Sequence, residues 1–335
     1  MAEPEPKINH NPKLQSYYAS LESVLGYDLL LGGTRHFGYY EDPGSYNPFP
    51  LSASLRRMEA QLAGALRARP GARVLDAGCG NGHVARYMAR ERGLHVTGID
   101  VVERHVRKAQ ATAARLAGEG SGEGEGTKGS LEVRRMDYHH LETLPDASLD
   151  AAYTMETLVH ATDPAQVLAG LFRVLKPGGR VAMHEYDNVL EEVVEAEEKE
   201  EGEGGKEKKG KKKKGKKKKR PDEGLRRAMR QVNEWSAMPT NAASRPGALP
   251  RLLEEAGFVD VRVRDLSAHI RPMTRLFYAL AIVPFLLLVR LLGLERRLVN
   301  TVAGVGAYRG RDFWRYIQIV ARKPGVGALV DDDDA

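Results

Sequence analysis

The sequence predicts an α/β protein built on a Rossmann-like, mostly parallel sheet. The first observation is that a strand, a glycine-rich turn, a helix and a second strand follow one another between Arg73 and Asp100, which is the order of a βαβ unit. The second is that short apolar runs and helically spaced runs keep alternating as far as about residue 190. The third is a length of 335 residues with 42% hydrophobic content, which suits one large core. We therefore expect one elaborated domain.

A tail and a helical lid are expected before the core. The opening MAEPEPKINHNPK has neither the apolar core of a signal peptide nor the Arg- and Ser-rich character of a transit peptide. We expect a mobile tail there and a cytoplasmic protein, with a peripheral contact to an internal membrane left open. From Leu14 apolar residues fall at helical spacing, and TRHFGYYEDPGSYNPF is then broken by Gly and Pro. An amphipathic helix over 51–69 leads to the first strand.

The glycine turn and its flanking acids indicate the kind of ligand. Gly78 and Gly80 allow the backbone to approach a ligand closely. Asp100, at the tip of the second strand, is placed to accept hydrogen bonds from both hydroxyls of a ribose. Asp76 stands just before the glycines, where its charge would repel a pyrophosphate. The site therefore favours a nucleoside ligand with a cationic end over a dinucleotide.

The later elements are predicted from the same patterns. A helix over 102–118 ends in a Gly-, Glu- and Ser-rich tract that we expect to be a flexible loop. The further elements, in order, are strands at 131–137 and 148–155, a helix at 168–175, a strand at 180–187, a helix at 222–238, a helix, Gly turn and strand over 248–267, and a closing strand at 313–324. One cysteine, Cys79, excludes an intramolecular disulfide. Its place in the turn suggests a small packed residue.

Composition changes abruptly at residues 191–220, which hold 13 Lys or Arg and 9 Glu. The tract accounts for most of the formal net charge of +6, so the rest of the chain carries no global charge that favours nucleic acid. It could serve as a nuclear-import signal, contact anionic lipid or RNA, or be a solvated insertion. The predicted parts are a tail and lid (1–70), a nucleoside-binding core (71–190), a disordered charged insertion (191–222), the remainder of the core (223–325) with an apolar helical cap (268–310), and an acidic tail (326–335).

The cap contains an unusually apolar run, Leu276 to Leu294, which Pro284 and Arg290 interrupt. Its uncharged stretch is only about fourteen residues, which is too short to span a bilayer that needs about twenty. We expect a helical cap packed over the core, a wall of an apolar substrate pocket, or a surface that rests on a membrane. Phe285 is the residue of this run that we expect to contact substrate.

Four motifs in order resemble the class I S-adenosylmethionine (SAM)-dependent methyltransferases. VLDAGCGNG resembles their SAM motif, and MDYHHLETLP, LDAAYTMETLVHATDP and VLKPGGRVAMHEY follow it. The resemblance implies a seven-stranded sheet with one antiparallel strand, and SAM as cofactor. It implies that Asp137 and Tyr138 hold the adenine, that the Met155 backbone lies near the methionine end of SAM, and that Glu156 and His160 point into the reaction chamber. A helix N-cap is the alternative for Asp137.

The segment SYYASLESVLGYDLLLGGTRHFGYY resembles, more loosely, the N-terminal part of the sterol C24-methyltransferase and tocopherol methyltransferase group. In that group a Tyr-rich helix and a His-containing loop close over SAM and substrate. The resemblance implies that Tyr17, Tyr18 and Phe37 contact substrate and that His36 takes part in catalysis. Helix packing is the alternative for the two tyrosines, and a loop histidine bonded to backbone is the alternative for His36. The tract YDLLLGG departs from the aromatic, acidic tract of the sterol enzymes.

The function that this reading predicts is methyl transfer from SAM to an apolar small molecule, such as a sterol, a terpenoid or another lipid-like acceptor. Direct displacement at the methyl group depends mainly on alignment, and we expect no metal. C-methylation is favoured by the resemblance alone. An O- or N-methyltransferase is the alternative function. A more distant alternative is a SAM-binding protein whose Lys-rich tract binds nucleic acid or anionic lipid.

Overall fold

The computed structural model describes residues 7–8, 11–119, 129–189 and 221–325. The predicted Gly-rich loop and charged insertion lie largely outside these residues, and the acidic tail lies wholly outside them.

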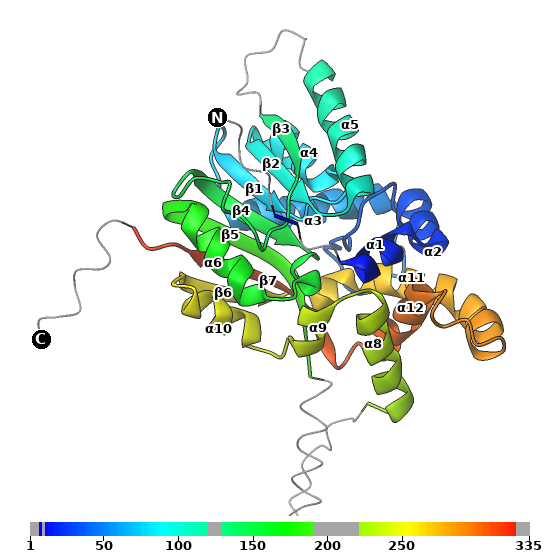
Figure 1. Ribbon diagram of the computed structural model, residues 1–335. Helices are drawn as coiled ribbons and strands as arrows, with labels where there is room; N and C mark the ends of the chain where they lie inside the picture. Colours follow the sequence, from blue (N-terminus) through cyan, green and yellow to red (C-terminus); the bar gives the residue numbers. More distant parts are fainter. Residues whose placement is uncertain (1–6, 9–10, 120–128, 190–220, 326–335) are drawn as a thin grey trace, which may run out of the picture.

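Seven strands form one sheet in the order β3-β2-β1-β4-β5-β7-β6 (Figure 1). They are β1 (Arg73–Ala77), β2 (His95–Asp100), β3 (Ser130–Arg135), β4 (Leu149–Met155), β5 (Leu175–Asn188), β6 (Val259–Asp265) and β7 (Trp314–Arg322). The first five pair in parallel, and β7 runs antiparallel to both β5 and β6. The expected mostly parallel sheet with one antiparallel strand is confirmed.

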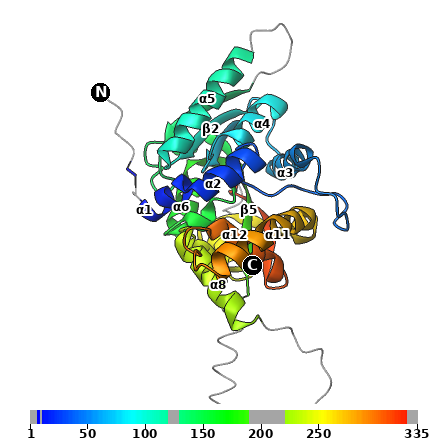
Figure 2. The same ribbon diagram turned by 90° about the vertical axis from the view of Figure 1, so that its right-hand side faces the viewer.

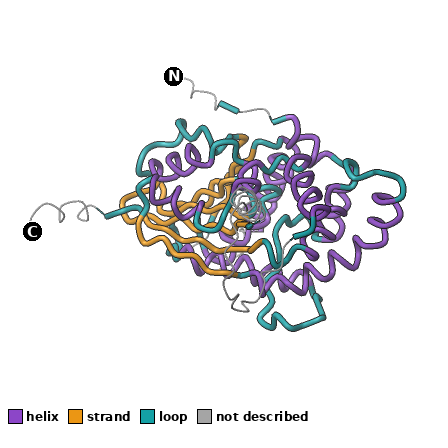
Figure 3. Tube along the Cα trace, turned by 90° about the horizontal axis from the view of Figure 1, so that it is seen from below, coloured by secondary structure: helices purple, strands orange, loops and turns teal. Residues whose placement is uncertain are grey.

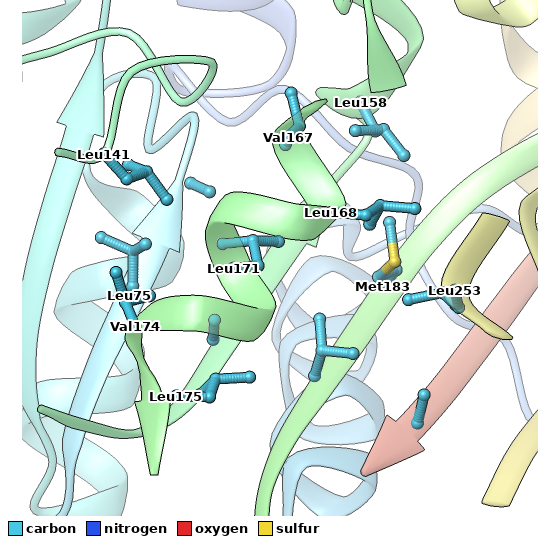
Figure 4. Close-up of a cluster of buried hydrophobic side chains, with 14 of the residues drawn as sticks. Leu75, Leu141, Leu158, Val167, Leu168, Leu171, Val174, Leu175, Met183 and Leu253 are labelled. Atoms are coloured by element: carbon cyan, nitrogen blue, oxygen red, sulfur yellow. The ribbon is translucent and has the colours of Figure 1, made fainter. Parts of the chain in front are cut away.

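Helices cover both faces of the sheet, as a parallel sheet requires. On one face α6 (Pro164–Val174) buries Leu168 and Leu171 among Leu75 of β1 and Met183 of β5 (Figure 4). The same cluster includes residues of α10 (Ala248–Glu255).

On the opposite face α3 (Leu51–Leu66) and α4 (His83–Arg92) bury Met58, Leu62 and Met88 in a second cluster. Beside them α5 (Glu103–Glu119) packs along β3. The helix expected over 51–69 ends at Leu66, because Arg67 adopts a left-handed conformation with φ 51° that ends helical hydrogen bonding.

The remaining helices gather at the carboxyl end of the parallel strands, away from most of the sheet (Figures 1 and 3). From the N-terminal part come α1 (Pro12–Ala19), α2 (Leu21–Val24) and the π-helical η1 (Leu25–Leu30), and from the later part α8 (Glu223–Trp235), α9 (Pro239–Ala243), α11 (Arg271–Pro284), the π-helical η4 (Phe285–Arg290) and α12 (Val299–Arg309). Glu22 of α2 joins the two groups, because its carboxylate accepts hydrogen bonds from the backbone N–H groups of Asn300 (2.8 Å) and Thr301 (2.6 Å) at the start of α12.

The apolar cap is longer than the uncharged stretch suggested. A continuous helical run, Ser267–Arg290, has 24 residues, and its most apolar window has a mean hydropathy of 1.8, which is long and apolar enough to cross a membrane. The helix meets this criterion by length and composition alone, because it begins at Ser267 and includes Arg271 and Arg275 ahead of the uncharged stretch. Its first half is nevertheless part of the domain, since Met273 is fully buried.

Candidate functional site

The glycine turn after β1 forms the floor of a cleft at the carboxyl end of the sheet. Gly78 has φ 100°, and a Cβ added there would lie 2.0 Å from Oγ1 of Thr157. The N–H groups of Gly78 and Cys79 both donate to the carbonyl of Ile99, at 2.9 Å each, which ties the turn to β2. A side chain at position 78 would therefore clash with Thr157 and would require an unfavourable backbone conformation.

Asp100 lies at the tip of β2, as predicted, and is held ionised. One carboxylate oxygen accepts from the N–H of Gly80 at 2.9 Å and the other from the N–H of Val102 at 2.7 Å. Burial alone would raise its pKa, but His105, 3.4 Å away, and these two N–H groups outweigh burial, so the pKa lies below its usual value. A charged acceptor in a rigid position suits the hydroxyls of a ribose.

Asp76 ends β1 in the same cleft and accepts a hydrogen bond from the Tyr153 hydroxyl at 2.8 Å. Burial raises its pKa to about 7, against the lowering effect of Tyr153, and the charge of Asp100 raises it further. Two buried carboxylates in one cleft are complementary to a ligand with positive charge. SAM carries a sulfonium and an ammonium group together with a ribose, so the residues present fit SAM.

The residues expected around the adenine and the methionine end also line this cleft. Asp137 uses Oδ1 to accept from the N–H of His139 at 2.9 Å. This bond lies in a turn and no helix begins there, so the helix N-cap considered as its alternative is not formed. The Tyr138 hydroxyl donates to the carbonyl of Thr157 at 3.1 Å, and Met155 is the buried last residue of β4. Their contacts with SAM stay predictions.

Glu156 lies between the cleft and a second, larger cavity. It has φ 57°, and its carboxylate accepts from the N–H of Phe37 at 2.8 Å and from the Tyr186 hydroxyl. Burial raises its pKa, although Tyr186, His36 and Phe37 act in the opposite direction. A non-glycine residue held in this conformation stores strain that is common at functional sites.

The two histidines expected in catalysis are both buried and largely engaged. Nδ1–H of His160 donates to the carbonyl of Ala237 at 2.9 Å, so its Nε2 accepts from the Tyr18 hydroxyl at 3.0 Å. Burial lowers the pKa of His160 to about 4. His36 donates to the carbonyl of Phe37 at 2.9 Å, which is the bonding considered as its alternative, and its Nε2 lies 3.7 Å from Glu59. The pKa of His36 is lowered by burial but raised further by Glu59, with a net upward shift.

The larger cavity, called the chamber below, has a volume of about 1170 Å³ and shares Arg35, His36 and Glu156 with the cleft. Tyr17 and Phe37 line the chamber, whereas Tyr18 lines the cleft instead.

Phe285 is not among the residues that line the chamber. It packs against the buried cluster of Val232, Val289 and Val302, because its position on η4 points it toward α8 and α12, while Leu288 of the same turn reaches the chamber. The structure thus corrects the expectation for Phe285.

Arg35 and Tyr186 were missed in the sequence. The Arg35 guanidinium lies over the rings of Tyr18 (4.9 Å) and Tyr27 (4.7 Å), and its Nε and Nη1 are buried without a hydrogen-bond partner in the described part of the chain. Arg35 lies within the segment TRHFGYY, and Tyr186 is the last residue of the motif VLKPGGRVAMHEY, so membership of these segments was the only local signal.

The fold and the cleft together define a SAM-dependent enzyme with class I methyltransferase architecture. Comparison with known proteins agrees: the methyltransferase domain model matches residues 75–183. The SAM-dependent Diels-Alderase iccD of Talaromyces variabilis is 42% identical over 311 residues, which cover 93% of this chain and 94% of iccD. The chain belongs to the class I SAM-dependent methyltransferase family, and SAM is its cofactor.

Two further comparisons bear on this family. The sterol 24-C-methyltransferase ERG6A of Gibberella zeae is 34% identical over 173 residues, which cover 52% of this chain and 41% of ERG6A. The crystal structure of the [4+2]-cyclase SpnF superposes with a TM-score of 0.63 at 22% identity, covering 96% of this chain and 100% of SpnF. At that identity the likeness to SpnF concerns the fold alone.

Proposed function

We propose that this chain binds an apolar, conjugated small molecule in the chamber and catalyses its [4+2] cycloaddition with SAM bound beside it. The observation that carries the proposal is the similarity to the Diels-Alderase iccD, at 42% identity over 93% of the chain. A match of that extent reaches far beyond the cofactor site into the segments that line the chamber. The match to the sterol methyltransferase covers only 52% of the chain.

The chamber supports an apolar substrate of considerable size. Its volume of about 1170 Å³ lies just above the range of roughly 300 to 1,000 Å³ that is typical of small-molecule pockets. Aromatic side chains form much of its inner wall, among them Tyr27, Phe37, Tyr186 and Trp314. Such walls provide contact area without flexible groups, which favours one folded conformation of a polyene.

The site meets the few chemical requirements of a cycloaddition. Two carbon–carbon σ bonds form between a diene and an alkene as their three π bonds become one, no atom is gained or lost, and no proton has to be removed. The protein therefore has to hold the two reacting ends in contact. Arg35, with two unpaired N–H groups, is placed to donate to a carbonyl conjugated with the alkene and to draw electron density from it. Bound SAM supplies a positive charge beside the chamber.

The test uses purified full-length protein, SAM and a panel of linear conjugated polyenes that carry a carbonyl group. Products are identified by mass spectrometry and NMR, with SAM-free and heat-denatured protein as controls. We expect a product of unchanged mass with a new six-membered ring, formed faster than without protein. A panel in which every polyene is either untouched or methylated would contradict the proposal.

Methyl transfer to an apolar acceptor is the second candidate. Glu156 favours it, because a buried carboxylate between cofactor cleft and chamber could stabilise a developing carbocation and then accept its proton. C-methylation of a sterol, terpenoid or other lipid-like acceptor, and O- or N-methylation, would each give a product heavier by one CH₂ unit together with S-adenosylhomocysteine. The same assay therefore separates the two candidates.

A further inference from the structure

Exposed apolar side chains are concentrated on two segments of the described chain. Eleven of its fifteen exposed large hydrophobic residues fall within 21–30 of α2 and η1 or within 280–292 of α11, η4 and the following turn. We call these two segments the apolar rim. A soluble surface rarely leaves so many leucines together in water unless something covers them.

The apolar rim surrounds part of the chamber. Leu21, Leu25 and Leu30 of its first segment and Leu280 and Leu288 of its second all line that cavity and are all exposed. Both segments lie on one side of the molecule, the side that faces the viewer in Figure 2. An apolar molecule that enters between them would therefore pass from one apolar surface to another.

Three arginines and one acid, Glu295, lie at the end of the second segment and just after it. Arg290, Arg296 and Arg297 are exposed, and they make no ion pair with the acidic side chains of the described residues. The acids of the first segment are engaged elsewhere: Asp28 with Lys108 at 2.6 Å and Arg104 at 3.0 Å, and Glu22 with the start of α12. Leucines flanked by free arginines are complementary to a bilayer with anionic headgroups.

A second copy of the chain fits the rim less well. A symmetric contact through this face would bring the three arginines of one copy toward those of the other, and burying like charges is unfavourable. A transmembrane arrangement is also disfavoured, because the first half of the run Ser267–Arg290 packs on the protein through Pro272, Met273 and Thr274.

We propose that the apolar rim docks on the surface of a membrane that contains anionic lipid, with its leucines in the boundary between headgroups and acyl chains, so that the chamber opens toward the lipid. This contact would let an apolar substrate enter from the bilayer. It does not depend on which reaction the chamber performs.

The test is co-sedimentation of the full-length protein with vesicles of phosphatidylcholine alone and of phosphatidylcholine and phosphatidylserine in equal parts. The test variant is Leu287→Asp/Leu291→Asp, at positions that are 56% and 75% exposed and outside the chamber lining. We expect it to bind the mixed vesicles at least about tenfold more weakly than wild type. The matched control is Val263→Asp on β6, which is 44% exposed and should bind like wild type.

Two further variants assign the contact. Arg296→Gln/Arg297→Gln should bind the mixed vesicles more weakly and with less dependence on salt. In protein that lacks residues 191–220, the two leucine substitutions should weaken vesicle binding as much as they do in the full-length protein. SAM affinity and thermal unfolding of each variant verify that it is folded.

Three results would overturn the proposal. One is wild-type protein that binds neither kind of vesicle. Another is vesicle binding that is unchanged in the leucine variant but lost on deletion of 191–220, which would assign the contact to the lysine tract. The third is a wild-type dimer in light scattering that the leucine variant converts to a monomer.

Discussion

Asp100 is ionised before any ligand arrives, because two backbone N–H groups and His105 hold its carboxylate at the end of β2. If the ribose of SAM binds at Asp100, as we expect, its binding costs little reorganisation there. Asp76, in the same cleft, has a pKa raised to about 7, so bound positive charge would lower that pKa again. We therefore expect the two acids to have different roles: Asp100 as a preformed acceptor, and Asp76 as a carboxylate whose charge is coupled to binding.

Replacing Asp100 by Ala should weaken SAM binding by about 1.5 to 3 kcal/mol, because a charged acceptor for both ribose hydroxyls is lost. Calorimetric titration of the folded variant measures this. Asp150→Ala is the matched control, since Asp150 accepts from the N–H of Arg73 and pairs with Lys176 and lies away from the cleft. Equal SAM affinity in Asp100→Ala and wild type would remove Asp100 from the site.

Glu185 makes the stability of the SAM-free protein depend on pH. Burial raises its pKa from 4.5 to about 7, although Thr154 and the N–H groups of Leu158 and Thr157 lower it. Between these values the folded state keeps a proton that the unfolded state releases, so the unfolding free energy falls as pH rises through this window, by up to about 3 kcal/mol.

Chemical unfolding of wild type and Glu185→Gln at about pH 5 and about pH 8 tests this linkage. The variant keeps a side-chain oxygen that can accept from Thr154 and Leu158 and should lose the part of the pH dependence that belongs to Glu185. Identical pH dependence in the two proteins would mean that Glu185 does not titrate in this range.

Among individual residues, the sequence predicted best those whose position is set by their neighbours in the chain. Gly78, Gly80, Asp76 and Asp100 could be identified because strand ends and glycine turns are encoded by neighbouring residues. Arg35 could not be identified in this way. Its position depends on how the loop that carries it folds against Tyr18 of α1 and Tyr27 of η1.

At the level of elements, one carboxylate is central to the contact between the lid and the cap. The Tyr17 hydroxyl and Ser23 add hydrogen bonds to the side chain of Asn300, at 2.6 and 3.2 Å. Glu22 of α2 accepts from two backbone N–H groups at the start of α12 and also from the Thr301 hydroxyl at 2.6 Å. The first N–H groups of a helix have no partner within the helix, and a negative charge there is favourable. The sequence gives no sign of this contact, because 278 residues separate Glu22 from Asn300.

Glu22→Ala should destabilise the protein by about 1 to 2 kcal/mol and loosen the lid. Amide hydrogen exchange should become faster in residues 12–30, since they lose the hydrogen bonds of Glu22 to the backbone of α12. Glu103→Ala is the matched control, because Glu103 occupies the first turn of α5 but is exposed and pairs with Arg107 and Arg135, neither of which belongs to the lid. Unchanged exchange in the lid would show that Glu22 does not hold it closed.

Element boundaries were predicted less well than element types. All seven strands were expected close to where they lie, because apolar runs bounded by turns mark buried strands. The end of α3 and the length of the cap helix were not, because they depend on the conformation of Arg67 and on packing around Met273.

For the molecule as a whole, we expect the charged insertion to be separable from the cofactor site. The described residues that line the cleft fall within 11–36 and 76–162. Deleting 191–220 should therefore leave SAM affinity and product formation unchanged, as measured by calorimetry and by the cycloaddition assay. A folded deletion variant that loses both activities would tie the tract to the active site, and loss of nucleic-acid binding would support the distant alternative.

We propose that SAM assists the reaction in the chamber without being consumed. To test this directly, the purified protein is supplied with one equivalent of methyl-labelled SAM and a large excess of a substrate that the product assay has identified. We expect many turnovers per SAM, product free of label, and SAM recovered intact. Product formation that stops after one equivalent, with label in the product and S-adenosylhomocysteine in equal amount, would contradict it and establish methyl transfer instead.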